Sequence, residues 1–375
     1  MFMTLVWFII ILAVLVLIHE FGHFIAAKRS GVLVEEFGFG FPPKLFGVRY
    51  RGTLYSFNAI PFGGFVKLKG VPGEDAHPEH FDDHNSFAKK AFLQKFFILS
   101  GGVFMNILLA VMLFAVGFTI GMPQVLDKSN LFSAARIRDE FIQIVETEPT
   151  LSAAQAGIQA GDTLLTLDGQ VVRSIEEVQE YNAERIGQTV AVQVRRGDET
   201  LTFPVNVSAL ENEERGVLGV QLARVGTVSY PWYLSFGFGI VYALQILWLI
   251  LGAFATLLID LITSGQVSAD LSGPVGIAAM TGQVAKLGFV YVLQFVALLS
   301  LNLALFNILP IPALDGGRIF FLIIEKLRRK KNSERVENVV HRIGFALLLV
   351  LIVLVTFRDL HRYSDSIKAF FSGIF

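Results

Sequence analysis

The chain opens with an apolar run from Phe2 to Ala27, which is long enough to cross a bilayer as a helix. Inside this run lies the sequence His19-Glu20-Phe21-Gly22-His23. Histidines at positions i and i+4 lie on one helical face, one turn apart, so both imidazoles can reach a single divalent ion. Glu20 lies between them, where a carboxylate can act as a general base on water activated by the ion, as in zinc hydrolases. The pattern predicts a metal site inside a membrane-spanning helix.

The alternative interpretation is a pair of core histidines and a glutamate that extends to the membrane surface. Ionisable side chains are costly in hydrocarbon, and they are rare there without a function. Here His19, Glu20 and His23 occur within little more than one helical turn and at metal-ligand spacing. This coincidence favours the metal site over the structural alternative.

The composition is that of a membrane protein: 53% of the 375 residues are hydrophobic and 17% are charged. A net charge of −1 gives no reason to expect a nucleic-acid partner. The chain has no cysteine, so thiolate zinc sites and disulfides are excluded and any metal has to be held by His and carboxylate ligands. The N-terminal run lacks a basic region before it, and cleavage would remove the metal motif, so we expect a retained span and not a signal peptide.

Basic residues predict which ends of the spans are cytoplasmic. Lys28 and Arg29 directly follow the first run, so this end should be cytoplasmic and the N-terminus outside. A second apolar run from Phe92 to Met122 returns outward, and it contains Gly101, Gly102 and Asn106 as positions for close packing or for reaching the site.

The segment 233–264 is apolar enough to span, but the charge distribution opposes a crossing. The strongest basic cluster, Lys326 to Lys331, should be cytoplasmic, and a single crossing between the outside domain and this cluster already satisfies that requirement. Polar residues also fall near one helical stripe of the segment. We therefore expect a helix that lies on the membrane surface.

The third crossing, 290–325, contains Asn307 and the interrupted sequence from Ile308 to Leu314. Pro310 and Pro312 break the helix within the membrane. Asp315 follows in apolar surroundings and needs a partner. It can be the third ligand of the histidine pair, which leaves a tetrahedral position open for water, or it can pair with Arg318 as a structural ion pair.

Residues 35–70 read as a small sheet rich in Phe and Gly. Irregular backbone in a membrane is tolerated where protein covers it or where it lines a wet cavity. The functional hypothesis is an edge strand near Gly64 to Leu68 that pairs with an extended substrate, and the alternative is an ordinary cytoplasmic hairpin. The polar loop that follows contains His77, His80 and His84, and we expect it to be a solvated acidic loop because Pro78 breaks any helix through it.

Between about Val125 and Leu222 the composition becomes that of a soluble domain. Strands are expected at 141–145, 163–167 and 190–195, with a helix at 175–185. Tight turns at 156–162 and 167–169 flank a buried strand. The arrangement resembles a PDZ domain, whose groove takes peptides by strand addition.

Several separated motifs together resemble the site-2 protease family, and in particular its bacterial branch with a PDZ domain that acts in regulated intramembrane proteolysis. The resemblance covers nearly the whole chain and rests on the following motifs: His19 to His23, Ile60 to Lys67, Ser272 to Val275, and Asn307 to Gly316. It implies that His19, His23 and Asp315 bind Zn2+, and that Glu20 is the catalytic base. It also implies that the region of Gly63, Gly64, Phe65 and Lys67 is a membrane-re-entrant β-loop that binds substrate together with Asn307.

The expected fold is a polytopic α-helical membrane protein with four transmembrane helices, a re-entrant β-loop and an inserted α+β PDZ domain. The predicted segments are a first span at 1–27, a cytoplasmic-side loop with the β-sheet at 28–91, a second span at 92–122, the PDZ domain at 125–222, a surface helix at 233–264, a third span at 290–325, a basic cytoplasmic loop at 326–342, a fourth span at 343–360 and a tail at 361–375.

The expected activity is zinc-dependent hydrolysis of peptide bonds in or near the transmembrane segments of single-span proteins, such as anti-sigma-factor-like proteins or signal-peptide remnants. The expected location is the bacterial cytoplasmic (inner) membrane, with both termini and the PDZ domain on the outer side. The other classes considered are a metal transporter, which would need a path through the membrane and usually internal repeats, and a scaffold built around the PDZ domain.

Overall fold

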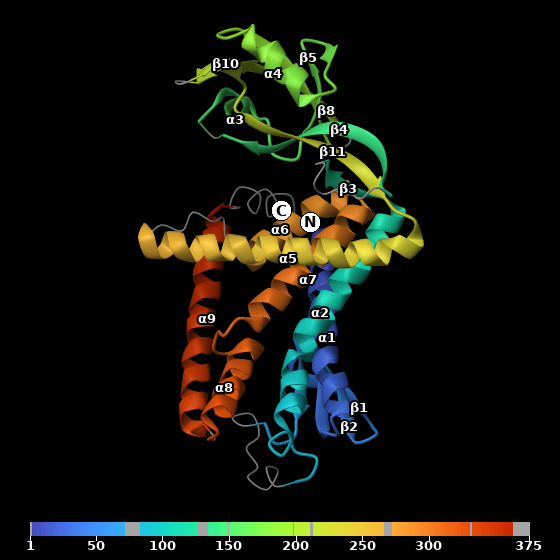
Figure 1. The fold of residues 1–375 in the computed structure, drawn as a ribbon, viewed down its shortest axis with the longest axis vertical. Helices are drawn as coiled ribbons and strands as arrows, with labels where there is room; N and C mark the ends of the chain where they lie inside the picture. The colour runs from blue at the N-terminus through green and yellow to red at the C-terminus, as the bar shows by residue number, and fades with distance from the viewer. Residues whose placement is uncertain are drawn as a thin grey trace, which may run out of the picture. The chain divides into compact units, whose positions relative to one another are not determined.

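A computed structural model describes residues 2–71, 83–126, 134–148, 150–197, 199–210, 213–265, 272–330 and 332–362 (Figure 1). The predicted polar loop with His77 and His80 lies outside these residues. The chain divides into two compact units: unit 1 comprises residues 1–115 and 236–375, and unit 2 comprises residues 116–235.

Unit 1 is mainly helical. Its helices are α1 (Phe2–Arg29), α2 (Phe92–Ile120), α5 (Trp232–Thr263), α6 (Pro274–Leu287), α7 (Phe289–Ile308), α8 (Asp315–Arg328) and α9 (Glu334–Arg362). Within the described residues, the helices α1, α2, α5, α7 and α9 are long and apolar enough to cross a membrane. The chain is therefore a helical, multi-pass membrane protein.

Helices α1 and α2 approach each other through glycines. A Cβ placed on Gly101 would lie only 2.6 Å from the carbonyl oxygen of Gly22, so the two backbones are in direct contact. Apolar side chains fill the space between α1 and α7, including Ile11, Leu15 and Phe295. This packing fixes α1, which carries both histidines, between α2 and α7.

The third crossing predicted from the sequence is two helices. Helix α7 ends at Ile308, and α8 begins at Asp315. The predicted interruption by Pro310 and Pro312 is present, because proline cannot donate the backbone hydrogen bond that would continue α7. Asp315 consequently occupies the first turn of a new helix, at the end of an irregular loop.

The predicted boundaries near the C-terminus are wrong in one respect. The basic loop expected at 326–342 is helical up to Arg328 and again from Glu334, and the expected span at 343–360 is the later part of α9. Charged residues mark where a helix leaves the membrane, but Glu and Arg are good helix formers and do not end it. Residues 363–375 of the predicted tail lie outside the described residues.

Two further differences concern the region before α7. The segments predicted from the sequence include no helix between 264 and 290, whereas the structure has α6 from Pro274, with proline in the first turn where its missing N–H is harmless. Helix α5 has almost the bounds of the predicted surface helix 233–264, and in Figure 1 it lies across the direction of α9.

The predicted small sheet is present as β1 (Val34–Tyr50) and β2 (Thr53–Leu68). Residues 36–39 pair with 64–67 on one side and with 54–57 on the other. Within the described residues, the segment 64–67 thus has a pairing partner along one side. It is the edge strand that the sequence predicts.

Unit 2 contains the inserted α+β domain. Its helices and strands are β3 (Met122–Val125), β4 (Arg136–Thr147), α3 (Ser152–Ala156), β5 (Thr163–Leu167), β6 (Gln170–Val171), α4 (Ile175–Ala183), β7 (Thr189–Arg196), β8 (Glu199–Asn206), β9 (Ser208–Leu210), β10 (Glu213–Val217) and β11 (Val220–Ser229). The main sheet has the order β3-β11-β4-β5-β7-β8 in the part of the chain that is described. The expected strands and helix are present, but β11 extends beyond the predicted end at 222, because Val225 and Val228 continue its buried face.

The turn at 157–162 is fixed by a bidentate ion pair between Arg196 and Asp162. Arg196 of β7 donates from Nε to Asp162 Oδ1 and from Nη2 to Asp162 Oδ2, both at 2.7 Å. Nη2 also donates to the carbonyl of Gly157 at 2.8 Å. The hydrogen bonds to Asp162 raise the pKa of Arg196. Since Asp162 is buried, this pair ties the turn to the central sheet.

Candidate metal centre

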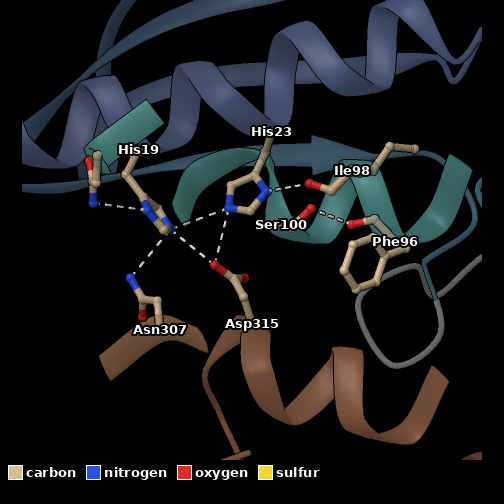
Figure 2. Close-up of polar contacts among 8 residues, drawn as sticks. His19, His23, Phe96, Ile98, Ser100, Asn307 and Asp315 are labelled. Atoms are coloured by element: carbon tan, nitrogen blue, oxygen red, sulfur yellow. Dashed lines mark hydrogen bonds and ion pairs between the residues drawn. The ribbon is translucent and has the colours of Figure 1, made fainter. Parts of the chain in front are cut away.

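The two histidines of α1 face the same point (Figure 2). Their Nε2 atoms lie 3.3 Å apart, and both side chains are buried. This is the arrangement that the i, i+4 spacing predicts, since α1 is an uninterrupted helix through both positions.

Asp315 joins the two histidines from the start of α8. Its Oδ2 lies 3.0 Å from Nε2 of His19 and 3.2 Å from Nε2 of His23. The contact between His19 and Asp315 joins residues 296 positions apart in the chain, so the α7–α8 break brings the carboxylate to α1. Of the two partners considered for Asp315, its Oδ2 contacts the histidine pair. Arg318 lines a cavity beside α8.

These three donors fit a tetrahedral metal ion. Ligand atoms about 2.0–2.1 Å from a tetrahedral zinc lie roughly 3.3–3.4 Å from one another. The three distances between His19, His23 and Asp315 are 3.3, 3.0 and 3.2 Å, close to that geometry. Among the described residues, this is the group whose ligand atoms come close enough together to hold an ion. Two imidazoles and one carboxylate leave a fourth position open, as in catalytic zinc sites.

The other ring nitrogen of His23 is held by α2. Its Nδ1 lies 2.7 Å from the carbonyl oxygen of Ile98 (Figure 2), so Nδ1 carries the proton and donates. Nε2 is then the nitrogen with a free lone pair, and it faces Asp315 and His19. Partners of this kind fix both the tautomer and the orientation of a metal-binding histidine.

Asn106 of α2 plays the same part for His19. Its side-chain amide lies 3.2 Å from Nδ1 of His19, and its Oδ1 is buried without a hydrogen-bond partner among the described residues. The two ends of an amide are interchangeable in shape, and the flipped amide accepts the Nδ1 proton. Ser300 of α7 donates to the backbone carbonyl of Asn106 at 2.8 Å, and both residues are fully buried.

The sequence places Asn106 near the site without deciding its role, and it gives no role to Ser300 or to the Ile98 carbonyl. A buried amide or hydroxyl in an apolar helix is a usable signal, because it needs a partner there. A backbone carbonyl leaves no such signal.

Asn307 lies at the metal centre itself. Its Nδ2 is 3.5 Å from Nε2 of His19, and the side chain is 9% exposed. The sequence predicts Asn307 as a residue that holds substrate; the structure brings its side chain next to His19 of the candidate metal centre.

Gly102 explains the close fit of α2 at this point. A Cβ on Gly102 would lie 2.5 Å from Nε2 of His23 and 2.6 Å from Cε1 of His19. The sequence predicts Gly101 and Gly102 as positions for close packing or for reaching the site. Gly101 does pack against α1, whereas Gly102 leaves room for the imidazoles.

The edge strand runs beside Glu20. A Cβ on Gly64 would lie 3.3 Å from Cγ of Glu20 and 3.5 Å from Val16. Gly63, with a φ of +93°, takes a conformation that favours glycine. Of the other residues predicted to bind substrate, Phe65 pairs with Gly38, and Lys67 forms an ion pair with Glu35 at 2.8 Å. The structure thus places Gly64 next to α1. It pairs the ammonium group of Lys67 with Glu35 of β1.

The chain is similar to known proteins of a single family. The model of peptidase family M50 matches residues 7–351. A Clostridium perfringens protein classed as a zinc metalloprotease is 34% identical over 358 residues, covering 96% of this chain and 98% of that protein. The regulator of sigma-W protease RasP of Bacillus subtilis is 31% identical, covering 96% and 98%, and the protease RseP of Yersinia pestis is 30% identical, covering 96% and 100%.

A solved PDZ domain of an SdrC-like protein from Listeria monocytogenes matches 23% of this chain and 92% of its own length, with 20% identity and a TM-score of 0.22.

Proposed function

This chain belongs to peptidase family M50 and is a zinc metalloprotease, and on that premise we propose that His19, His23 and Asp315 hold its zinc and that Glu20 is the general base. The observation that carries the proposal is the mutual contact of two Nε2 atoms and one carboxylate oxygen inside an apolar helical unit. Zinc, when bound, acts as a Lewis acid that activates water and polarises a carbonyl.

The chain's own residues do the remaining work. Glu20 takes a proton from the attacking water and delivers it to the leaving amine, which is the usual task of a carboxylate in this position. Asn307 donates its amide N–H toward the carbonyl oxygen of the scissile bond, where negative charge develops. Ile98 and Asn106 contact the Nδ1 atoms of His23 and His19. These contacts keep both imidazoles oriented with Nε2 toward Asp315.

The substrate is an extended segment of a membrane protein. Peptide bonds in a transmembrane helix are hydrogen-bonded internally, so the helix has to unwind before it can be cut. An unwound segment that pairs with the edge strand 64–67 regains backbone hydrogen bonds in a setting without water. Because Gly64 adjoins Glu20, such a segment would lie beside the general base.

The proposed membrane topology has four crossings, made by α1, α2, α7 with α8, and α9. Helix α5 is long enough to cross, but it lies across the direction of α9 in unit 1 (Figure 1), as a helix on the membrane surface would. Lys28 and Arg29 at the end of α1 and the basic end of α8 are then both cytoplasmic. Both termini and the inserted domain are outside.

The inserted domain is proposed to be a PDZ domain that filters substrates. A cavity of about 270 Å³ lies between α4 and the start of β11, lined by apolar side chains that include Ile175, Val178 and Val220. This is the position in which a peptide strand can add beside β11. A substrate with a bulky outer domain would be excluded until that domain had been trimmed.

The proposed substrates are single-span proteins of the bacterial cytoplasmic membrane, such as anti-sigma-factor-like proteins or signal-peptide remnants. The name of the Bacillus subtilis relative, regulator of sigma-W protease, supports the first class.

The test is metal analysis of the purified protein together with cleavage of a model single-span substrate in detergent. The proposal requires about one zinc per chain and cleavage that stops when Glu20 is changed to Gln. Metal transport into proteoliposomes without any cleavage would contradict it and support a transporter.

A further inference from the structure

The loop Leu309–Leu314, which presents Asp315, is packed closely by glycines of α8. Gly316 lies against the carbonyl of Leu309, and a Cβ on Gly317 would be 2.5 Å from the carbonyl oxygen of Ile311. The side of the loop toward α8 is therefore fixed by direct backbone contact.

Helix α9 holds the loop from another side. A Cβ on Gly344 would be 2.8 Å from the carbonyl oxygen of Pro312, so this helix also touches the loop backbone. One turn earlier on α9, Nδ1 of His341 accepts a hydrogen bond from the N–H of Ala313 at 2.9 Å. These two contacts act on neighbouring residues of the loop, directly before the metal-binding carboxylate.

Ala313 needs such support. Its φ is +78°, in the left-handed region that residues with a Cβ rarely adopt, and a conformation of that kind costs on the order of 1–3 kcal/mol unless the surroundings maintain it. A cavity of about 530 Å³ adjoins Ala313, His341 and Phe345. The hydrogen bond that the Ala313 N–H donates to Nδ1 of His341 is a direct restraint on this strained residue.

We propose that His341 is a positioning residue for Asp315: its imidazole, fixed on α9, accepts the Ala313 N–H and so holds the loop in the one conformation that brings the carboxylate to both histidines. The inference rests on the proposed zinc site. The His341 ring also packs against Phe321 of α8, with centroids 5.7 Å apart, so it bridges the two helices on either side of the loop. As an acceptor, Nδ1 has no proton, and Nε2 carries it.

The effect on the metal follows from the geometry. Oδ2 of Asp315 contacts His19 and His23 at 3.0 and 3.2 Å, and a change in Ala313 moves the start of α8. Changes of partners outside the ligand set lower metal affinity by about 10- to 100-fold in other metal sites.

The experiment compares zinc affinity of the full-length protein in detergent, by competition with a chromophoric chelator. His341→Phe keeps the ring against Phe321 and removes the acceptor, so the dissociation constant for zinc should rise about 10-fold. His341→Asn places Oδ1 where Nδ1 was and should retain wild-type affinity, whereas His341→Gln places its oxygen one atom further and should behave like the Phe variant. The matched control is His361→Phe, an exposed histidine on the same helix, which should leave affinity unchanged.

Wild-type affinity in the His341→Phe protein, or equal loss in the Asn and Phe proteins, overturns the proposal. If the Phe variant does not fold, the comparison of Asn with Gln decides, because both are polar and differ in the position of the acceptor. The Asp315→Asn variant distinguishes a failure of the proposed zinc site from a failure of the proposed role of His341. If that change leaves zinc affinity intact, the proposed zinc site is wrong; if it weakens binding and His341→Phe does not, the role of His341 alone is wrong.

Discussion

Glu20 and Gly64 lie against each other: a Cβ on Gly64 would be 3.3 Å from Cγ of Glu20. One residue belongs to α1 and the other to the edge segment of the β1–β2 sheet. The proposed general base and the proposed substrate-binding strand are therefore neighbours, and each can be changed separately.

Gly64→Val tests the strand. The added side chain would push the segment 64–67 away from α1, at Val16 and Glu20. Displacement of a bound substrate by about 1 Å can reduce turnover by roughly 100-fold. We expect cleavage of a single-span substrate to fall by at least tenfold, with zinc content unchanged. Val48→Leu, at an exposed position of β1, is the control. Full activity of the Gly64 variant would remove the strand from the mechanism.

Glu20→Gln tests the base. The amide keeps the size of the side chain but cannot take a proton, so the rate of cleavage should fall by about 100-fold or more. Zinc content should stay the same, because Glu20 is not among the three donors. The measurement is cleavage in detergent alongside metal analysis, with Phe21→Leu as the neighbouring control. Normal cleavage by the Gln variant would end the assignment of Glu20.

Asp315→Asn tests the third ligand. Loss of the negative charge should weaken zinc binding markedly, as measured by chelator competition. Arg318→Gln separates this from the ion-pair interpretation of Asp315. If that interpretation were correct, the Arg318 change would disturb the protein at least as much as the Asp315 change; we expect zinc binding to survive it.

Asn106 gives a prediction about the outer contacts of the site. Asn106→Leu removes the partner of His19 Nδ1 and should weaken zinc binding by about 10- to 100-fold. Asn106→Asp still accepts the Nδ1 proton and should bind zinc at least as well as wild type. The control is Asn302→Leu, because the Asn302 side chain bonds to the carbonyl of Leu298 in its own helix. Equal affinity in the Leu and Asp variants would contradict the orienting role.

The position of α5 can be tested by labelling, since the natural chain has no cysteine. A cysteine introduced at Ser264, after the end of α5, should react with an impermeant maleimide in intact spheroplasts. Cysteines at Gln170 and Arg29 serve as references for the outside and the cytoplasm, because neither side depends on whether α5 crosses. Reaction of the Ser264→Cys protein only after permeabilisation would show that α5 crosses, and four crossings would be the wrong number.

The grouping of the three proposed zinc ligands could be predicted from the sequence because each is an ionisable group in apolar surroundings. His19, His23 and Asp315 need partners in the membrane, and chemistry limits what those partners are. The interruption before Asp315 was equally readable, since Pro310 and Pro312 cannot continue a helix.

The supports of the site could not be predicted in the same way. His341 acts on the backbone N–H of Ala313, 28 residues away, and a backbone group has no signature in the sequence. Helix α6 was missed because its composition, with small residues such as Gly276 and Ala279, has no strong periodicity; its N-terminus is held by the carboxylate of Asp359, which accepts from the Gly276 N–H at 2.7 Å. The early start of α9 was missed because its first turns are charged.

The backbone contact between Gly22 and Gly101 also constrains inhibitor design. Because the backbones of α1 and α2 touch just beside the histidines, neither a lipid tail nor a drug-sized ring can pass between these two helices. A compound aimed at the three proposed zinc ligands is therefore not expected to enter between α1 and α2.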